Sequence, residues 1–224
     1  AFQDPRRFGW KSGPEGRPNS TENMSRLNAP AASGNATLDF LRHTTSNALM
    51  SAEQVREAAK DGNYRPQSSG NPLLTVASLI RGGLATRIYY VTVGGYDTHV
   101  NQGGLHSQLH RQFAEGLREF HQQLKRDGTA NRVTTMVFSE FGRRVAENGG
   151  GGTDHGAAAP LFLMGTNIEA GLHGPMPSLT DLDNGDLRHS VDFRQVYAAI
   201  LRDWLATEPR PILLDDFDAM KLFA

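Results

Sequence analysis

The feature that most constrains this chain is a strand–helix–strand pattern between residues 86 and 138. Residues 86–93 are a nearly continuous run of β-branched and aromatic residues, which is typical of a buried strand. Apolar residues spaced three and four apart predict a helix over 105–124, and residues 133–138 form a second apolar run. This order is a βαβ unit, which predicts a parallel sheet with helices on its faces.

Further elements extend this α/β pattern in both directions. Residues 1–34 are rich in Pro, Gly, Arg, Ser and Asn and have no hydrophobic periodicity, so we expect an extended or flexible arm. Residues 35–224 are expected to form a single α/β domain. Its other predicted elements are a third short strand at 160–164 and helices from Leu38 to Ala59, after Asn71-Pro72 and over 193–205.

Composition excludes several classes of protein. The 224 residues carry a formal net charge of −1, so the chain lacks the basic surface that binds nucleic acid. It contains no cysteine, which excludes disulfides, thiolate metal sites and a cysteine nucleophile. No apolar run approaches the roughly 20 residues that a membrane-spanning helix needs. Because the first residue is Ala1, we expect that a leader has been removed or that the chain is a piece of a longer one.

Three polar clusters lie next to the predicted strands. In open α/β sheets, ligands bind outside the carboxyl ends of the strands, and these clusters are expected at that edge. The sequence therefore predicts that they meet in one site. The clusters are Asp97-Thr98-His99, Ser139-Glu140 and Asp154-His155.

Carboxylates and imidazoles without thiolates indicate a divalent metal, and they suit Zn²⁺ or Mn²⁺ better than Mg²⁺ or Ca²⁺. Such a site holds one metal, or two about 4 Å apart, and it activates water and neutralises charge on a phosphoryl or sulfuryl oxygen. Arg143 is the candidate oxyanion binder, because a guanidinium can hold such a group bidentately. The predicted metal ligands are Asp97, His99, Glu140, Asp154 and His155.

Structural roles compete with these assignments. Asp97 could cap the turn after its strand, and Glu140 could form a salt bridge with Arg143 or Arg144. Asp154-His155 could be a turn with a hydrogen-bonded histidine. Weaker candidates for a site are His106 with His110, which share a helix face, and also His173 and Ser139.

Four segments together resemble the family catalogued as domain of unknown function 1501. The resemblance runs from about Leu38 to the C-terminus and implies membership of the alkaline phosphatase and sulfatase superfamily. It implies a three-layer αβα fold with a mostly parallel sheet. Many members of the family carry a twin-arginine export leader, which implies a periplasmic or cell-surface location. The segments are GGYDTH at 94–99, FSEFGRRVAEN at 138–148, GTDHG at 152–156 and DFRQVYAAILRDWL at 192–205.

The resemblance also implies that this chain corresponds to a C-terminal portion. In that superfamily, the Ser or Thr nucleophile and the first metal-binding Asp lie in the N-terminal half, so the nucleophile is not identified here. Ser139-Glu140 stands where the superfamily has an Asp-His pair. This departure favours a single metal ion or a rearranged pair of metal ions.

Three functions follow from these residues. The first is a metal-dependent hydrolase of phosphate or sulfate esters, acting on a small molecule or a polysaccharide. The second is a non-catalytic, exported binding or scaffold protein that retains the hydrolase fold and a structural metal. The third is a glycosidase that uses Asp97 and Glu140 as a carboxylate pair. The third ranks last because it leaves the histidines unexplained.

Overall fold

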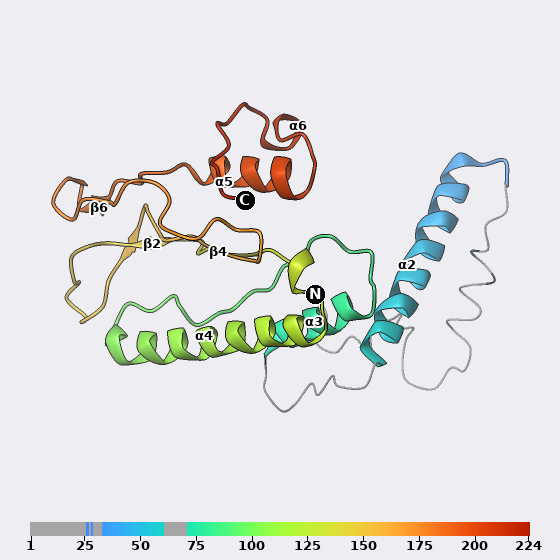
Figure 1. Ribbon diagram of the computed structural model, residues 1–224, viewed down its shortest axis with the longest axis horizontal. Coiled ribbons are helices and arrows are strands. Elements are labelled where there is room, and N and C mark those ends of the chain that lie inside the picture. The colour runs from blue at the N-terminus through green and yellow to red at the C-terminus, as the bar shows by residue number, and fades with distance from the viewer. Residues whose placement is uncertain (1–25, 27, 29–32, 61–70) are drawn as a thin grey trace. The chain divides into compact units, whose positions relative to one another are not determined.

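The computed structural model describes Arg26, Asn28 and residues 33–60 and 71–224 (Figure 1). The arm predicted over residues 1–34 lies almost entirely outside the described residues. None of the described helices is long and apolar enough to cross a membrane.

The chain divides into two compact units, and each is described by itself. The prediction of a single domain over 35–224 stays a prediction. The first unit runs to Thr92 and includes Gly116–Asp127, and the second comprises Val93–Glu115 and Gly128–Ala224.

The first unit contains the helices α2 (Ala36–Lys60) and α3 (Pro72–Arg81), which confirms two predicted helices. Asn71 caps α3, because its side-chain oxygen accepts a hydrogen bond from the backbone N–H of Leu73 at 3.1 Å. The small core of this unit joins Val55 of α2 to Leu79 of α3. Apolar burial along one face of each helix therefore holds these two helices together.

The long helix α4 (Gln102–Arg126) confirms the helix of the predicted βαβ unit. Its stripe of apolar residues becomes more buried toward its C-terminal end. Leu105 is exposed, whereas Phe120 and Leu124 are buried. The residues of α4 up to Glu115 belong to the second unit, and those from Gly116 belong to the first.

The strands of the described residues form three antiparallel pairs and no parallel one. The predicted strands at 133–138 and 160–164 are present in shorter form, and they pair with each other. The mostly parallel three-layer fold stays a prediction. The pairs are β1 (Thr135–Val137) with β4 (Phe162–Met164), β2 (Gly142–Arg143) with β3 (His155–Gly156), and β5 (Leu182–Asp183) with β6 (Asp186–Leu187).

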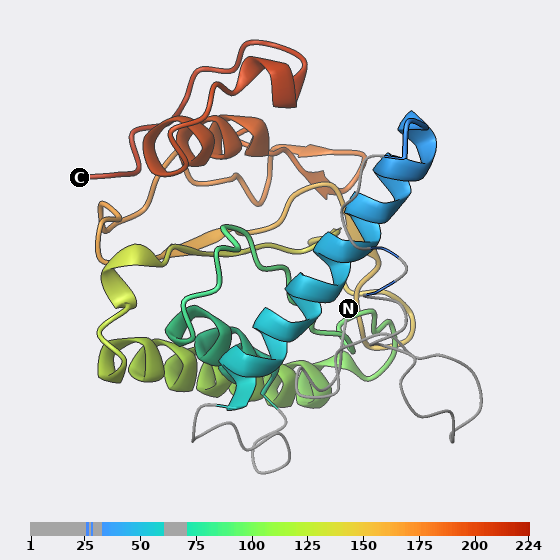
Figure 2. The same ribbon diagram turned by 90° about the vertical axis from the view of Figure 1, so that its right-hand side faces the viewer.

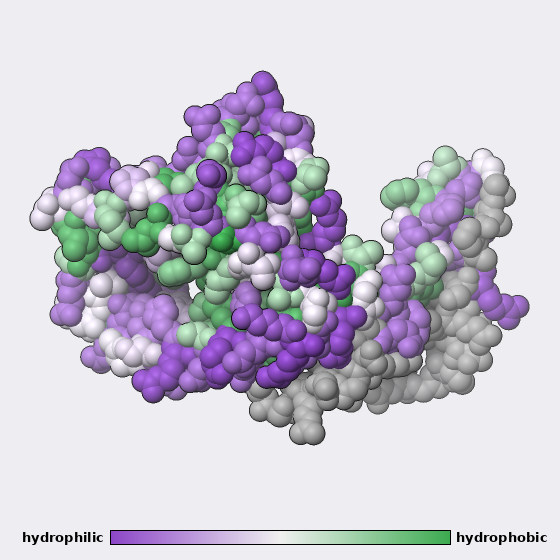
Figure 3. Space-filling model, in the orientation of Figure 1, coloured by the Kyte–Doolittle hydropathy of each residue, from purple (hydrophilic) through white to green (hydrophobic). Residues whose placement is uncertain are grey.

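The prediction of a buried strand at 86–93 is wrong for this structure. No residue from Leu84 to His99 belongs to a strand. Ile88 and Tyr90 are 71% and 75% exposed, so the run is not a buried one. On the face of the molecule drawn in Figure 3, hydrophobic and hydrophilic residues are mixed. β-branched and aromatic residues favour a strand only where neighbouring strands pack against them, and none of the strands in the described part of the chain pairs with this run.

The C-terminal part of the second unit packs a helix on the β1–β4 pair (Figure 2). Helix α5 (Phe193–Ala199) continues as a π-helical turn over Ile200–Trp204, which confirms the predicted last helix. Val196 and Ala199 of α5 pack with Leu222 and with the half-buried apolar residues of the two strands. A 3₁₀ turn at Ala130–Arg132 and the short helix α6 (Arg210–Leu213) complete the elements.

Candidate metal site

Asp97 and His99 come from the loop that leads into α4. Gln102, the first residue of that helix, is buried and holds the loop in place. Its side-chain nitrogen donates to the backbone oxygen of Thr98 at 2.9 Å and to the hydroxyl of Thr98 at 3.0 Å. Its side-chain oxygen accepts a hydrogen bond from the hydroxyl of Thr153 at 2.8 Å. One buried amide therefore ties the Asp97 loop to the segment that carries the second histidine.

His155 comes from the hairpin of β2 and β3, where it pairs in register with Arg143. The ring of His155 stacks on that of Phe141, with centroids 3.8 Å apart and planes 12° apart. The guanidinium of Arg143 lies 5.0 Å from the Phe141 ring centre. The orientation of the His155 ring is therefore set by an aromatic neighbour on its own hairpin.

The tip of this hairpin is folded around Asn148. The side-chain oxygen of Asn148 accepts hydrogen bonds from the backbone N–H of Gly150 at 2.9 Å and of Gly152 at 3.2 Å. Such local bonds are typical of Asn in turns. A Cβ atom on Gly152 would lie 2.3 Å from the backbone oxygen of His99. Only glycine allows the hairpin to come this close to the His99 loop.

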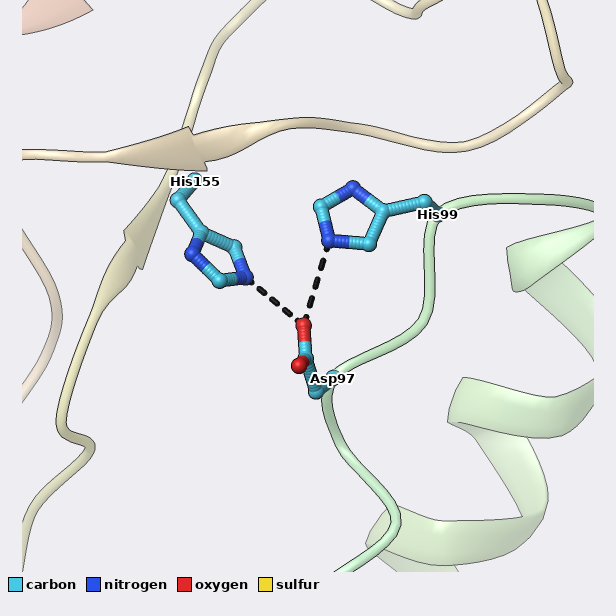
Figure 4. A group of neighbouring side chains, drawn as sticks. All are labelled: Asp97, His99 and His155. Carbon is cyan, nitrogen blue, oxygen red and sulfur yellow. Dashed lines mark hydrogen bonds and ion pairs between the residues drawn. The ribbon is translucent and has the colours of Figure 1, made fainter.

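Asp97, His99 and His155 converge on one point (Figure 4). The Oδ1 atom of Asp97 lies 2.8 Å from Nε2 of His155 and 3.1 Å from Nε2 of His99. One potential ligand atom from each of the three residues lies within 4.8 Å of the others. Two imidazoles and a carboxylate in this arrangement are a suitable ligand set for a divalent metal.

Asp154, which is held by Asn148, lies beside the other ring nitrogen of His99. The Nδ1 atom of His99 lies 3.4 Å from Oδ1 of Asp154. The side-chain nitrogen of Asn148 donates to that same Asp154 oxygen at 3.1 Å and to the backbone oxygen of His99 at 3.1 Å. Each ring nitrogen of His99 therefore faces a different carboxylate.

The polar contacts favour the charged form of both carboxylates. The hydrogen bond from His155 lowers the pKa of Asp97, and the bond from His99 adds to this effect. The hydrogen bond from Asn148 is the main cause that lowers the pKa of Asp154, and His99 contributes again. Both side chains are ionised at neutral pH, as metal binding requires.

The structure brings together some of the predicted ligands and not others. Asp97, His99 and His155 form the cluster, and Asp154 lies beside it. Glu140 is exposed and is not part of the group of three. The predicted alternative of a salt bridge to Arg144 is not formed, because the Nε of Arg144 instead lies 3.6 Å from Asp186.

Arg143 joins the two loops of the site. Its guanidinium donates to the backbone oxygen of Tyr96 and to that of Thr153, both at 2.6 Å. These bonds use two of its five N–H donors. Its predicted role as oxyanion binder stays a prediction.

The weaker candidates lie outside the cluster. The rings of His106 and His110 pack edge-on against Tyr96, with centroids 6.0 Å and 5.2 Å away. His173 bonds the backbone oxygen of Glu169 at 2.9 Å. The hydroxyl of Ser139 accepts from the backbone N–H of Phe141 at 3.4 Å. Among the described residues, only Asp97, His99 and His155 form a group suited to a metal.

Sequence reasoning missed the residues that hold the ligands in place. Asn148 precedes four glycines, and Asn before Gly is a turn signal that could have indicated its role. Gln102, Thr153 and Phe141 carry no comparable signal, because their contacts depend on how two distant segments meet.

These observations define a protein with a candidate metal centre of two histidines and one carboxylate, built from a loop and a β-hairpin. Comparison with family models then places the chain. It belongs to the family described as "Protein of unknown function (DUF1501)", whose model matches residues 16–205. Comparison with curated proteins and with solved structures gives no match.

Proposed function

We propose that the protein is a metal-dependent hydrolase of phosphate or sulfate esters. The observation that carries this proposal is the convergence of Asp97, His99 and His155 on one point. Two histidines and one carboxylate are the ligand set of several hydrolytic zinc sites, and they leave a coordination position for water or substrate. The sequence resemblance implies membership of the superfamily of alkaline phosphatases and sulfatases. This membership is the reason for proposing phosphate or sulfate esters as the substrates.

The residues fit such a metal in chemistry and geometry. The donor set is nitrogen and oxygen without sulfur, which suits Zn²⁺ or Mn²⁺ better than Mg²⁺ or Ca²⁺. Ligand atoms roughly 2 Å from zinc lie roughly 3 Å apart, and Asp97 lies 2.8 Å and 3.1 Å from the two histidines. The three side chains can therefore enclose an ion after small rotations.

Each ligand side chain has a defined task in this proposal. A bound divalent metal would lower the pKa of a water molecule to about 7 and polarise the ester oxygen. Asp97 would supply the negative charge, and each of the two imidazoles would offer its Nε2 to the metal. The exposure of Asp97 and His155 leaves one side of the site accessible to a substrate. Arg143 is proposed to hold the oxyanion with the donors that Tyr96 and Thr153 do not use.

The hydrolase proposal is tested by activity on aryl phosphate and aryl sulfate esters with added Zn²⁺ or Mn²⁺. We expect metal-dependent hydrolysis that falls at least about 100-fold in Asp97→Ala, because that variant removes the only carboxylate ligand. Glu140→Gln is the matched control, since Glu140 is an exposed carboxylate outside the cluster. Hydrolysis that is unaffected by chelator, or equal in Asp97→Ala and the control, would contradict the proposal.

A second function is a non-catalytic, exported binding or scaffold protein with a structural metal. This function requires a fourth protein ligand that closes the site to water, and Asp154 is the candidate because its Oδ1 lies 3.4 Å from Nδ1 of His99. A periplasmic or cell-surface location is part of both proposals and rests on the resemblance alone. The two functions differ in whether Asp154 binds the metal itself.

A further inference from the structure

We propose that Asp154 is not a metal ligand but a positioning residue that orients His99 from outside the coordination sphere. This inference rests on the proposed metal site and specifies its ligand set. It revises the sequence-based assignment of Asp154 as a ligand. It also leaves the metal with three protein ligands and an open position.

The two nitrogens of the His99 ring face different carboxylates. Nε2 of His99 faces Asp97, as does Nε2 of His155, so the metal position lies on the Nε2 side of both rings (Figure 4). Asp154 lies on the other side of the His99 ring, 3.4 Å from Nδ1. The ring of His99 therefore stands between Asp154 and the point where the ligands converge.

A histidine that binds a metal through one ring nitrogen has a hydrogen to donate from the other. When Nε2 of a neutral histidine binds a metal, Nδ1 must carry the hydrogen. That hydrogen needs an acceptor, and metal-bound histidines commonly donate it to a carboxylate. Oδ1 of Asp154 is the acceptor that the structure places at Nδ1 of His99.

The side chain and backbone of Asp154 are themselves held in place by hydrogen bonds. Asn148 donates to Oδ1 of Asp154 and to the backbone oxygen of His99, both at 3.1 Å. The backbone oxygen of Asp154 accepts from the N–H of Arg144 at 3.0 Å. Asn148 thus fixes the carboxylate relative to the backbone of the histidine that it orients.

The test compares Asp154→Asn, Asp154→Ala and the control Glu140→Gln in the full chain, loaded with Zn²⁺ or Co²⁺. We expect both Asp154 variants to keep the metal stoichiometry of the wild type and to bind Zn²⁺ about 10–100-fold more weakly, with Asp154→Asn the milder. The visible spectra of both Asp154 variants loaded with Co²⁺ should indicate the same coordination number as in the wild type. In the wild-type Zn²⁺ form, nitrogen NMR should show the hydrogen on Nδ1 of His99.

Three results would overturn the inference. They are a changed Co²⁺ coordination number in both Asp154 variants, a Zn²⁺ affinity equal to that of Glu140→Gln, and a hydrogen on Nε2 of His99. These readouts need no activity, so they are independent of whether the protein hydrolyses esters. Asp154→Asn retains the shape and an acceptor oxygen, so it tests the inference even if Asp154→Ala does not fold.

Discussion

At the scale of single residues, the site depends on a close approach between two backbones. Gly152 is buried, and its Cα lies against the backbone of His99 and Val100. The hydrogen bonds from Asn101 to Gly150 and from Gln102 to Gly151, at 3.0 Å and 3.1 Å, run along the same contact. This contact places the two histidines on one side of Asp97.

We predict that Gly152→Ala weakens Zn²⁺ binding by more than about tenfold. A methyl group there would lie 2.3 Å from the backbone oxygen of His99, so the two loops must move apart. Gly149→Ala is the matched control, because a Cβ at Gly149 meets no atom within 4 Å. Titration of both variants with Zn²⁺ measures the effect. Equal affinities in the two variants would show that the close approach is not needed.

The sequence predicted the metal-ligating group only in part. The prediction rests on Asp97 and His99 following the predicted strand at 86–93 and on His155 preceding the predicted strand at 160–164, on a loop that passes the same edge. Glu140 follows the same rule but is exposed and outside the group. The position of a residue in the sequence indicates which loop carries its side chain. The direction of the Glu140 side chain depends on the hairpin of β2 and β3, which follows Glu140 in the chain.

At the scale of elements, the helices agree with the prediction more fully than the strands do. The strands predicted at 133–138 and 160–164 are present in shorter form, whereas the one predicted at 86–93 is not. Apolar spacing in α2 and α4 and the Asn71-Pro72 cap of α3 are local signals that need no distant partner. A strand is stabilised by its neighbours, so the same residues can form a strand or an unpaired extended segment. Residues 86–93 are the example, because their composition favours a strand and none of the described strands pairs with them.

We predict that Asn71→Ala destabilises the first unit by about 1–2 kcal/mol, measured by denaturant unfolding. The variant loses the cap of α3 and the hydrogen bond from Asn71 to the backbone oxygen of Gly116 at 2.9 Å. Asn71→Ser keeps a capping oxygen and loses only the second bond. It should therefore lose less than Asn71→Ala. If Asn71→Ser were as destabilised as Asn71→Ala, the cap would contribute nothing.

At the scale of the whole molecule, the three proposed metal ligands all belong to one unit. Asp97, His99 and His155 lie in the segments Val93–Glu115 and Gly128–Ala224. A ligand that binds only the folded state stabilises the part of the chain that forms its site. Metal binding should therefore stabilise the second unit directly.

We predict that Zn²⁺ raises the midpoint of thermal unfolding by several degrees. At 100 times the dissociation constant, binding contributes about 2.7 kcal/mol, which corresponds to roughly 5–10 °C for a chain of this size. Scanning calorimetry with Zn²⁺ and then with chelator measures the shift. The His155→Ala variant serves as the control and should show little shift. A shift of the same size in His155→Ala would place the stabilising ion elsewhere.

The most direct test of the proposed metal centre is the metal content of the purified protein and of a double variant. The wild-type protein and the double variant Asp97→Ala/His155→Ala are loaded with Zn²⁺ and freed of excess metal. Their zinc content is then measured by inductively coupled plasma mass spectrometry. We predict one tightly bound ion per chain in the wild type and none in the double variant, because only His99 of the three ligands is left. The same metal content in both proteins, or none in either, would contradict a metal site at Asp97, His99 and His155.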